Sequence, residues 1–229
     1  DWIGGFGSAR YDTDQMTAFG VFGWTSSSFT VTDHFTKYNS ATHKSSWQSS
    51  GDGGALMLTN NGLTGTQLKM GARYFMSSDM SVFANFGSIN KVPILDQAID
   101  DEDYAIMEQP VQENFTSLEV GTRASLMNNQ MTVNAVWYNS TWNDRQARKY
   151  AQNAEGQSIV AQLEGLDQLH TGIELEVAYQ PMPMMRVDAA LGIGNWTYTS
   201  DVKAKYEDYD GGSRQTKEAT LYIKDLHVG

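Results

Sequence analysis

The sequence predicts an all-β protein, the antiparallel wall of a transmembrane β-barrel, with about eight to nine strands. Three observations lead to this prediction. Apolar and polar residues alternate with a period of two, the alternating segments reach about 10–13 residues, and short connections alternate with long ones along the chain. A strand needs about 9–11 residues to cross the hydrocarbon of a bilayer at a tilt. Alternation of short and long connections is typical of outer-membrane barrels.

The alternation is visible in six segments. In Gln67–Tyr74, for example, Leu68, Met70 and Ala72 alternate with Lys69 and Gly71. Successive side chains of a strand point to opposite faces, so each segment has one apolar face and one polar or small face. The other five segments show the same pattern: Ser81–Gly87, Ser117–Leu126, Met131–Tyr138, Thr171–Tyr179 and Val187–Gly194. We also expect strands over 16–24 and 29–38, which makes eight, and the start of a ninth over 217–227.

The connections predict hairpins. Ser77–Asp79, Asn128–Asn129 and Pro181–Pro183 are short and have turn-forming residues, and Thr25–Ser28 is predicted to be a further turn. Between hairpins we expect long loops over 39–64, 91–114, 143–167 and 199–216. Short turns face the periplasm in outer-membrane barrels and long loops face the exterior.

Charged residues decide which face meets lipid. Arg or Lys on the lipid face near the bilayer midplane costs roughly 2–4 kcal/mol. The charged residues of these segments share the polar face, which we therefore assign to the lumen: Arg73, Glu119, Arg123, Glu174, Glu176 and Asp188. A soluble antiparallel sheet explains the alternation equally well, but not the loop asymmetry or the strand length.

Composition excludes several other classes of protein. The net charge of −11 disfavours binding to nucleic acid, whose phosphates would be repelled. The absence of cysteine excludes disulfide scaffolds and thiolate metal sites. No apolar run is long enough for a transmembrane helix.

Several motifs resemble TonB-dependent outer-membrane receptors of the Bacteroidetes type. Gly165–Glu176, with the sequence GLDQLHTGIELE, is similar to a strand-opening motif of this family, and Leu191–Val202 is similar to its return strand. Further similar stretches follow in family order over about 65–229: Met70–Tyr74, Val82–Gly87, Ser117–Gly121, Trp137–Arg145 and Leu221–Gly229.

The resemblance implies a larger barrel, usually of about 22 strands, with an N-terminal plug domain in its lumen. Residues 1–229 would then be part of the barrel wall, without the plug. The implied function is active transport of a scarce nutrient across the outer membrane, where the substrate is a ferric chelate, a vitamin or an oligosaccharide. The implied partners are the energy-coupling protein TonB, the plug, outer-membrane lipid and the nutrient. The resemblance implies that the six charged residues assigned to the lumen contact the plug. The alternatives are a small self-contained outer-membrane barrel acting as an adhesin or structural protein, and a soluble β-sandwich binding module.

Candidate sites are few. Trp142 and Trp196 fall on the lumen face by parity and are our candidates for ligand contact. We expect no catalytic residues: Glu174 and Glu176 lie about 7 Å apart along one strand, in a wide solvated lumen. We expect no cofactor, except that Asp100, Asp101 and Asp103 form an acidic loop that could bind calcium through oxygen ligands. The alternative for this loop is a solvated run of charge.

Overall fold

The computed structural model describes residues 1–33, 36–39, 44–47, 56–100, 105–106, 111–152, 156, 158–210 and 213–228. Their main feature is one ten-stranded antiparallel sheet. Its strands are β1 (Trp2–Asp12), β2 (Met16–Asp33), β5 (Leu56–Phe75), β6 (Met80–Asn90), β9 (Asn114–Leu126), β10 (Met131–Gln152), β11 (Ser158–Met182), β12 (Met185–Tyr198), β13 (Val202–Asp210) and β14 (Ser213–Leu221). Two small strand pairs lie apart from this sheet. One is β3 (Thr36–Asn39) with β4 (Lys44–Trp47), and the other is β7 (Ile99–Asp100) with β8 (Ala105–Ile106). The short helix α1 (Leu95–Ala98) directly precedes β7.

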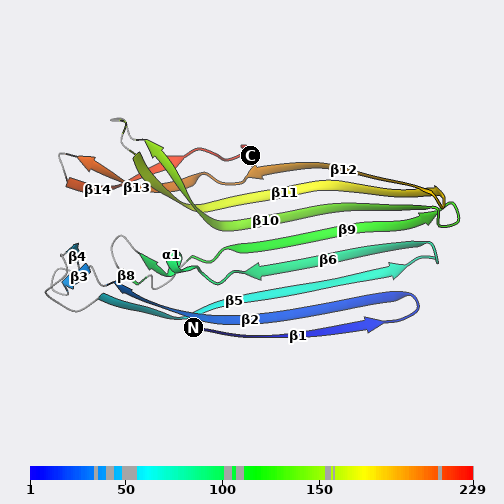
Figure 1. Cartoon of the computed structure of the whole chain (residues 1–229), viewed down its shortest axis with the longest axis horizontal. Coiled ribbons are helices and arrows are strands. Elements are labelled where there is room, and N and C mark those ends of the chain that lie inside the picture. Colours follow the sequence, from blue (N-terminus) through cyan, green and yellow to red (C-terminus); the bar gives the residue numbers. More distant parts are fainter. Residues whose placement is uncertain are drawn as a thin grey trace.

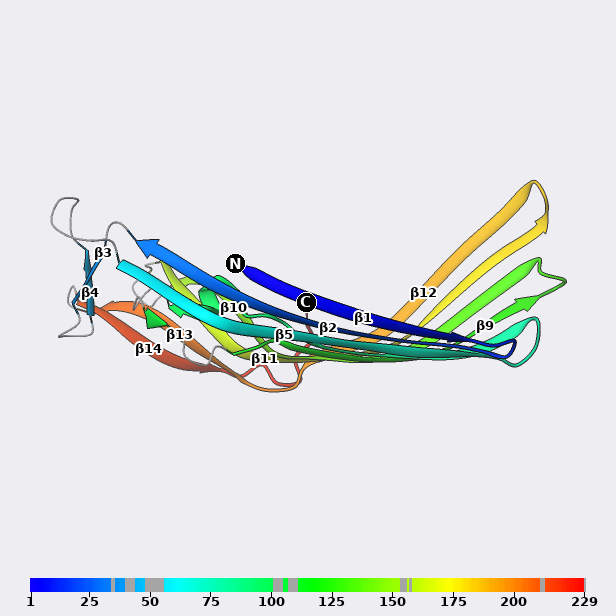
Figure 2. The same ribbon diagram turned by 90° about the horizontal axis from the view of Figure 1, so that it is seen from below.

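The main sheet is a single curved layer (Figures 1 and 2). In chain order each of its strands from β1 to β11 pairs with the next, and β11 pairs with both β12 and β13. No second layer packs on either face of the described sheet, which excludes the soluble sandwich, because a sandwich needs two packed sheets. The sheet is open, since β1 pairs with β2 alone.

The two ends of the sheet differ as the sequence predicts. The short turns lie together at the right-hand end of Figure 1, and the longer connections lie at the opposite end. The turn after β9 uses left-handed backbone at Met127 (φ 54°), Asn128 (φ 53°) and Asn129 (φ 67°). Asparagine tolerates this region better than most residues, which explains why the Asn128–Asn129 pair marks the turn.

The prediction of a turn at Thr25–Ser28 is wrong. These residues continue β2, where Thr25 lies opposite Gly4 of β1 and Gly65 of β5. The hairpin turn is instead at residues 13–15, where Met16 N–H donates to Thr13 Oγ1 at 2.9 Å. Serine and threonine fit a strand when both sides are paired, so the hydroxyl-rich run is not a turn here. β1, which the sequence analysis did not predict, is the partner that completes this pairing.

The predicted long loops contain more strand than expected. Residues 143–152 extend β10, and residues 158–167 extend β11, so most of the expected loop 143–167 is a paired hairpin. The expected loop 199–216 is mostly β13 and β14. The start of a ninth wall strand is predicted over 217–227, but residues 217–221 belong to β14, which pairs with β13. The chain reaches the free edge of β12 only near its end, where Val228 N–H donates to the Trp196 carbonyl at 2.9 Å. There His227 also forms an isolated bridge with Thr197 of β12.

The extension of β11 changes partners through a local bend. Gly165 has a left-handed φ of 74°, and Asp144 opposite this region has φ 56°. Asp167 fixes the bend, because its Oδ1 accepts from Asp144 N–H at 2.8 Å and its Oδ2 accepts from Ser200 Oγ at 3.0 Å. Above the bend β11 pairs with β13. A small hydrophobic cluster there joins the two strands, formed by Leu163, Leu166, Val202 and Ala204.

We predict that the turn after β9 discriminates sharply between residue types. Asn129→Val should lower the free energy of unfolding by about 1 kcal/mol or more, because a β-branched residue is disfavoured at positive φ. Gln130→Val, one residue further on, is the control and should change stability by less than about 0.5 kcal/mol. Guanidinium unfolding of the full-length protein in detergent, followed by tryptophan fluorescence, measures both. Equal effects of the two variants would contradict the assigned backbone.

Candidate functional site

The candidate functional site comprises the two faces of the curved sheet. We call eight of its strands the wall strands: β1, β2, β5, β6, β9, β10, β11 and β12. Residues directly opposite each other on neighbouring strands share a face, so the register sorts every wall residue onto one of two faces. The inner face is the hollowed one, where the surface depressions lined by Arg123, Glu176 and Trp196 lie. The outer face is the opposite side of this sheet, whose curvature Figure 2 shows.

The outer face has an apolar belt without a single charged side chain. One threonine lies within it, Thr122, whose hydroxyl donates to the Ser81 carbonyl at 3.0 Å. The large belt residues are well exposed, for example Ile173 at 58% and Ile193 at 69%. A contiguous apolar surface of this kind marks contact with lipid or with another macromolecule.

The upper edge of the belt is sharp on all eight strands. The unbroken run of outward apolar residues ends toward the long loops, in sheet order, at Ile3, Trp24, Leu68, Phe86, Leu118, Trp137, Ile173 and Ile193. Two positions further along each strand, the next outward residue is polar without exception: Asp1, Ser26, Thr66, Ser88, Thr116, Asn139, Thr171 and Asn195.

This edge runs obliquely across the sheet. Ile3 lies opposite Ser26, Trp24 opposite Thr66, Leu68 opposite Ser88, and Leu118 opposite Asn139. At each of these four places the edge drops by one outward residue, or about 6.8 Å along the strand. Over the seven strand intervals, each about 4.8 Å wide, four drops correspond to a tilt of about 40°. Strands of outer-membrane barrels tilt by about 35–45° from the membrane normal.

The height of the belt agrees with the same geometry. On β12 the outward apolar residues run from Met185 to Ile193, a length of about 30 Å at 3.4 Å per residue. A tilt of about 40° reduces this length to a height of about 23 Å. The apolar band of outer-membrane barrels is about 25 Å tall. The belt therefore has the tilt and the height of a membrane-spanning barrel wall.

The six charged residues predicted to face the lumen all lie on the inner face. Asn85 Nδ2 donates to Glu119 Oε2 at 3.2 Å, and Asn134 Nδ2 donates to Glu176 Oε2 at 3.3 Å. Arg73 Nε donates to Ser81 Oγ at 2.9 Å. The structure thus shows these residues on one face, while their contact with a plug domain stays a prediction.

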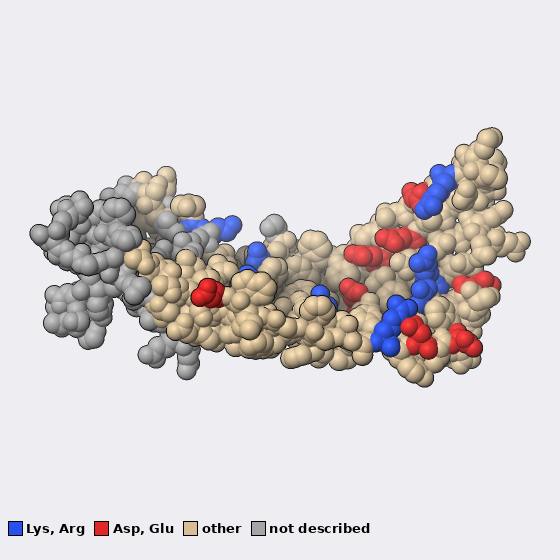
Figure 3. Space-filling view, turned by 60° about the horizontal axis from the view of Figure 1, so that its bottom comes forward, with Lys and Arg blue, Asp and Glu red and all other residues tan. Residues whose placement is uncertain are grey.

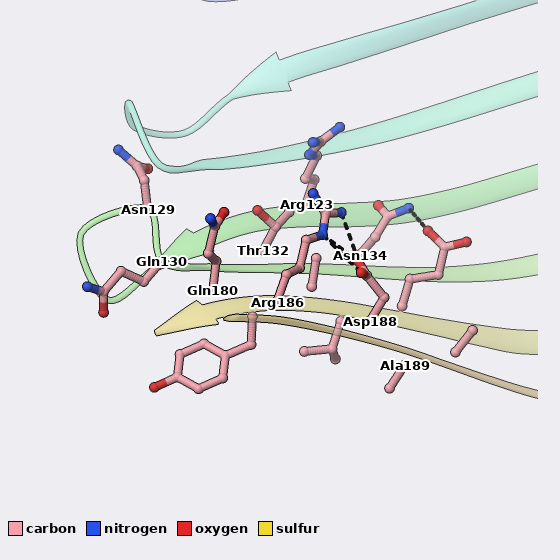
Figure 4. A pocket seen from close by; sticks show the side chains of 14 residues that line it. Arg123, Asn129, Gln130, Thr132, Asn134, Gln180, Arg186, Asp188 and Ala189 are labelled. Carbon is pink, nitrogen blue, oxygen red and sulfur yellow. Dashed lines mark hydrogen bonds and ion pairs between the residues drawn. The ribbon is translucent and has the colours of Figure 1, made fainter. Parts of the chain in front are cut away.

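Charged side chains gather on the inner face near the short-turn end (Figure 3). A depression of about 600 Å³ lies there, lined among others by Arg123, Glu176, Arg186 and Asp188 (Figure 4). Arg186 binds Asp188 through two nitrogens, at 2.8 and 2.9 Å. Both side chains are about 60% exposed, and exposed pairs contribute little to stability. These groups therefore remain available to bind another surface.

Toward the long-loop end the inner face has aromatic rings that lie against glycines. Phe83 covers Gly121, where an added Cβ would lie 2.4 Å from the ring, and Tyr138 covers both Gly172 and Gly194. Phe83 lies directly opposite Gly121, and Tyr138 lies directly opposite Gly172, which in turn lies opposite Gly194 on the next strand. The sequence alone does not reveal these pairs, because each depends on knowing which strands are neighbours.

The two tryptophans predicted to contact ligand both lie on the inner face but have different surroundings. Trp142 is enclosed: Arg145 lies over its ring, 4.4 Å from the centroid, and its Nε1 donates to Glu113 at 3.3 Å. Trp196 is 48% exposed, and its Nε1 donates to Tyr138 Oη at 3.0 Å. Ligand contact stays a prediction for both residues, and the geometry favours Trp196.

The predicted calcium site cannot be placed, because the side chains of Asp100, Asp101 and Asp103 lie outside the described part of the chain. Among the residues that the structure describes, no three carboxylate, histidine or cysteine side chains meet as a metal site. The described part of the chain also has no helix whose length and hydropathy suit a bilayer span.

Comparison with known proteins finds a likeness in fold but none in sequence. No family model matches the sequence, and no characterised protein matches it in sequence. Among solved structures, the copper transporter OprC superposes with a TM-score of 0.61 at 14% identity, covering 92% of this chain and 33% of OprC. The ferric-catecholate import receptor Fiu from E. coli K12 matches at a TM-score of 0.49 and 11% identity, over 91% of this chain and 32% of Fiu.

The chain thus spans about a third of the length of both structures. At this identity the likeness to OprC shows the fold alone, which is that of an antiparallel wall forming part of a larger barrel. The fold predicted from the motifs is confirmed.

We predict that the aromatic–glycine pairs are sensitive to a single methyl group. Gly121→Ala should destabilise the protein by about 1–3 kcal/mol, because the Cβ displaces the Phe83 ring. Gly192→Ala is the matched control on the same face, since nothing lies within 4 Å of its added Cβ. Chemical unfolding of both variants in detergent tests this, and a Gly121→Ala variant as stable as Gly192→Ala would contradict the packing.

Proposed function

We propose that this chain is part of the barrel wall of a TonB-dependent outer-membrane receptor, which imports a small scarce nutrient. The observation that carries the proposal is the oblique apolar belt, with a tilt of about 40° and a height of about 23 Å. The open sheet favours a segment of a larger barrel over a small barrel closed by this chain alone.

In this proposal the two faces have separate tasks. The belt holds the wall in outer-membrane lipid, and the charged inner face near the short turns binds a plug domain supplied by another segment of the protein. Arg123 is exposed there and has no ion-pair partner among the described residues, so its guanidinium is free to bind a carboxylate of the plug. TonB would act on the plug, and the wall itself would do no chemistry.

The substrate class follows only broadly from the fold. The proposal covers a ferric chelate, a vitamin or an oligosaccharide, bound by the outer loops together with the plug. The wall contributes the inner face above the belt, where Trp196 is exposed.

The belt gives a test that separates lipid from water. Leu191→Arg should reduce folding into the membrane by about 1–3 kcal/mol, because Leu191 lies within the belt, one outward residue below the edge residue Ile193, and is 59% exposed. Gly192→Arg, the next residue, faces inward with open space around it and should be tolerated. Yield in the outer-membrane fraction and resistance of the folded band to heat before electrophoresis measure both variants. In a soluble protein an exposed leucine is replaced without loss, so tolerance of Leu191→Arg would overturn the proposal.

Transport gives an independent test. Cells that carry the gene should deplete at least one solute from a defined medium that gene-deleted cells leave behind, as measured by mass spectrometry of the spent medium. An uncoupler that collapses the proton gradient should abolish the difference, because TonB-dependent import draws on that gradient. Depletion that persists with the uncoupler would contradict active import.

A further inference from the structure

A second depression on the inner face lies at the height of the upper belt edge. It measures about 390 Å³, and we call it the vestibule depression, lined chiefly by Phe83, Glu119, Tyr138, His170, Glu174 and Trp196. Trp196 follows Asn195 and His170 precedes Thr171, the first polar outward residues of their strands. These two rings therefore lie just above the belt, and Glu174 lies just below its edge. The depression is separate from the charged one near the short turns.

The aromatic side of the depression is held in place. Tyr138 is fixed against Gly172 and Gly194, and its hydroxyl accepts the hydrogen bond from Trp196 Nε1. His170 packs against Trp196 with ring centroids 5.4 Å apart, and its Nε2 lies 3.2 Å from Oε1 of the buried Gln168. The indole keeps 48% of its surface exposed in spite of these contacts. It therefore offers a preorganised surface on which a ring can stack.

The charged side of the depression is acidic. Glu174 is exposed and has no hydrogen-bond or ion-pair partner among the described residues, and Glu119 accepts a single bond from Asn85. None of the residues lining this depression is lysine or arginine. Ionised carboxylates only accept hydrogen bonds, and the face of an indole attracts cations. Both features favour a ligand that is positively charged and rich in hydrogen-bond donors.

We propose that the vestibule depression binds a cationic ring compound, whose ring stacks on Trp196 and whose ammonium group binds Glu174. This inference rests on the proposed function, because it treats the inner face above the belt as the entrance of an import pathway. It narrows the substrate class of that pathway to cations and disfavours anionic chelates.

Three sugars of the same ring and different charge provide the test. Saturation-transfer NMR on the full-length protein in detergent at pH 7 compares glucosamine, glucose and glucuronate, which are cationic, neutral and anionic. Glucosamine should bind about fivefold more tightly than glucose, as expected for an exposed ion pair, and glucuronate should bind most weakly. The preference for glucosamine should shrink at high salt, because exposed charges are screened.

Variants assign the effect to residues. Glu174→Gln should abolish the preference for glucosamine over glucose, and Trp196→Leu should weaken the binding of both sugars. Trp196→Phe keeps a ring if the leucine variant folds poorly. Glu218→Gln, which removes a charge from β14 outside the depression, should leave the order of the three sugars unchanged.

The outcomes are distinct from those of the proposed function. Equal or tighter binding of glucuronate, unchanged preference in Glu174→Gln, or no saturation transfer to any of the three sugars would overturn the vestibule site. The proposed function as a barrel wall would be unaffected by these outcomes, because its test is the outer-membrane yield of Leu191→Arg compared with Gly192→Arg.

Discussion

The whole structure depends on the two-residue alternation of a strand whose two faces meet different surroundings. Each wall strand is paired on its sides, so the backbone polar groups are satisfied within the sheet, and only the side chains distinguish the faces. A shift of one residue in any strand would move Arg73 or Glu174 to the apolar side and Tyr74 or Ile173 to the polar side. The register is therefore fixed by the contrast between the faces, which explains why one sheet without a second layer has a defined arrangement.

The tilt of the strands explains a repeated motif that otherwise looks accidental. Arg10–Asp12 on β1 and Arg186–Asp188 on β12 have the same Arg-x-Asp spacing, and in both the arginine binds the aspartate at the inner face. The residue between them, Tyr11 or Val187, is an outward residue close to the lower edge of the belt. Tyr11 lies opposite Ala18 on β2, several residue pairs above the level of Val187 when traced through the register. A tilt of about 40° brings the two motifs to the same height, so both lie along the lower rim.

The sequence alone predicts features that depend on a single strand, such as the face on which a residue lies. It does not predict features that depend on which two strands are neighbours. The faces of Arg123 and Trp196 follow from parity, which is a local property. β1 was missed because its outward residues include Gly5 and Gly7, which weaken the alternation. The run Thr25–Ser28 was assigned to a turn because its composition suits a turn, but paired neighbours on both sides keep it in a strand. The aromatic–glycine pairs depend on register and could not be derived from spacing.

The same distinction decides between the two candidate tryptophans. By parity Trp142 and Trp196 are equivalent, since both face inward near the upper end of their strands. Trp142 lies opposite Phe115 and Gln168, and Arg145 and Glu113 occupy its ring face and its nitrogen. Trp196 lies opposite His170, and it shares the space over Gly194 with Tyr138, where a side chain on the glycine would clash with both rings. Small residues on neighbouring strands thus determine which aromatic ring remains accessible. The accessible ring of Trp196 shares its depression with Glu174, which has no partner among the described residues. Arg123 and Arg186 line the other depression, nearer the short turns. The inner face thus has an upper region suited to a cationic ligand and a lower region suited to a charged protein surface.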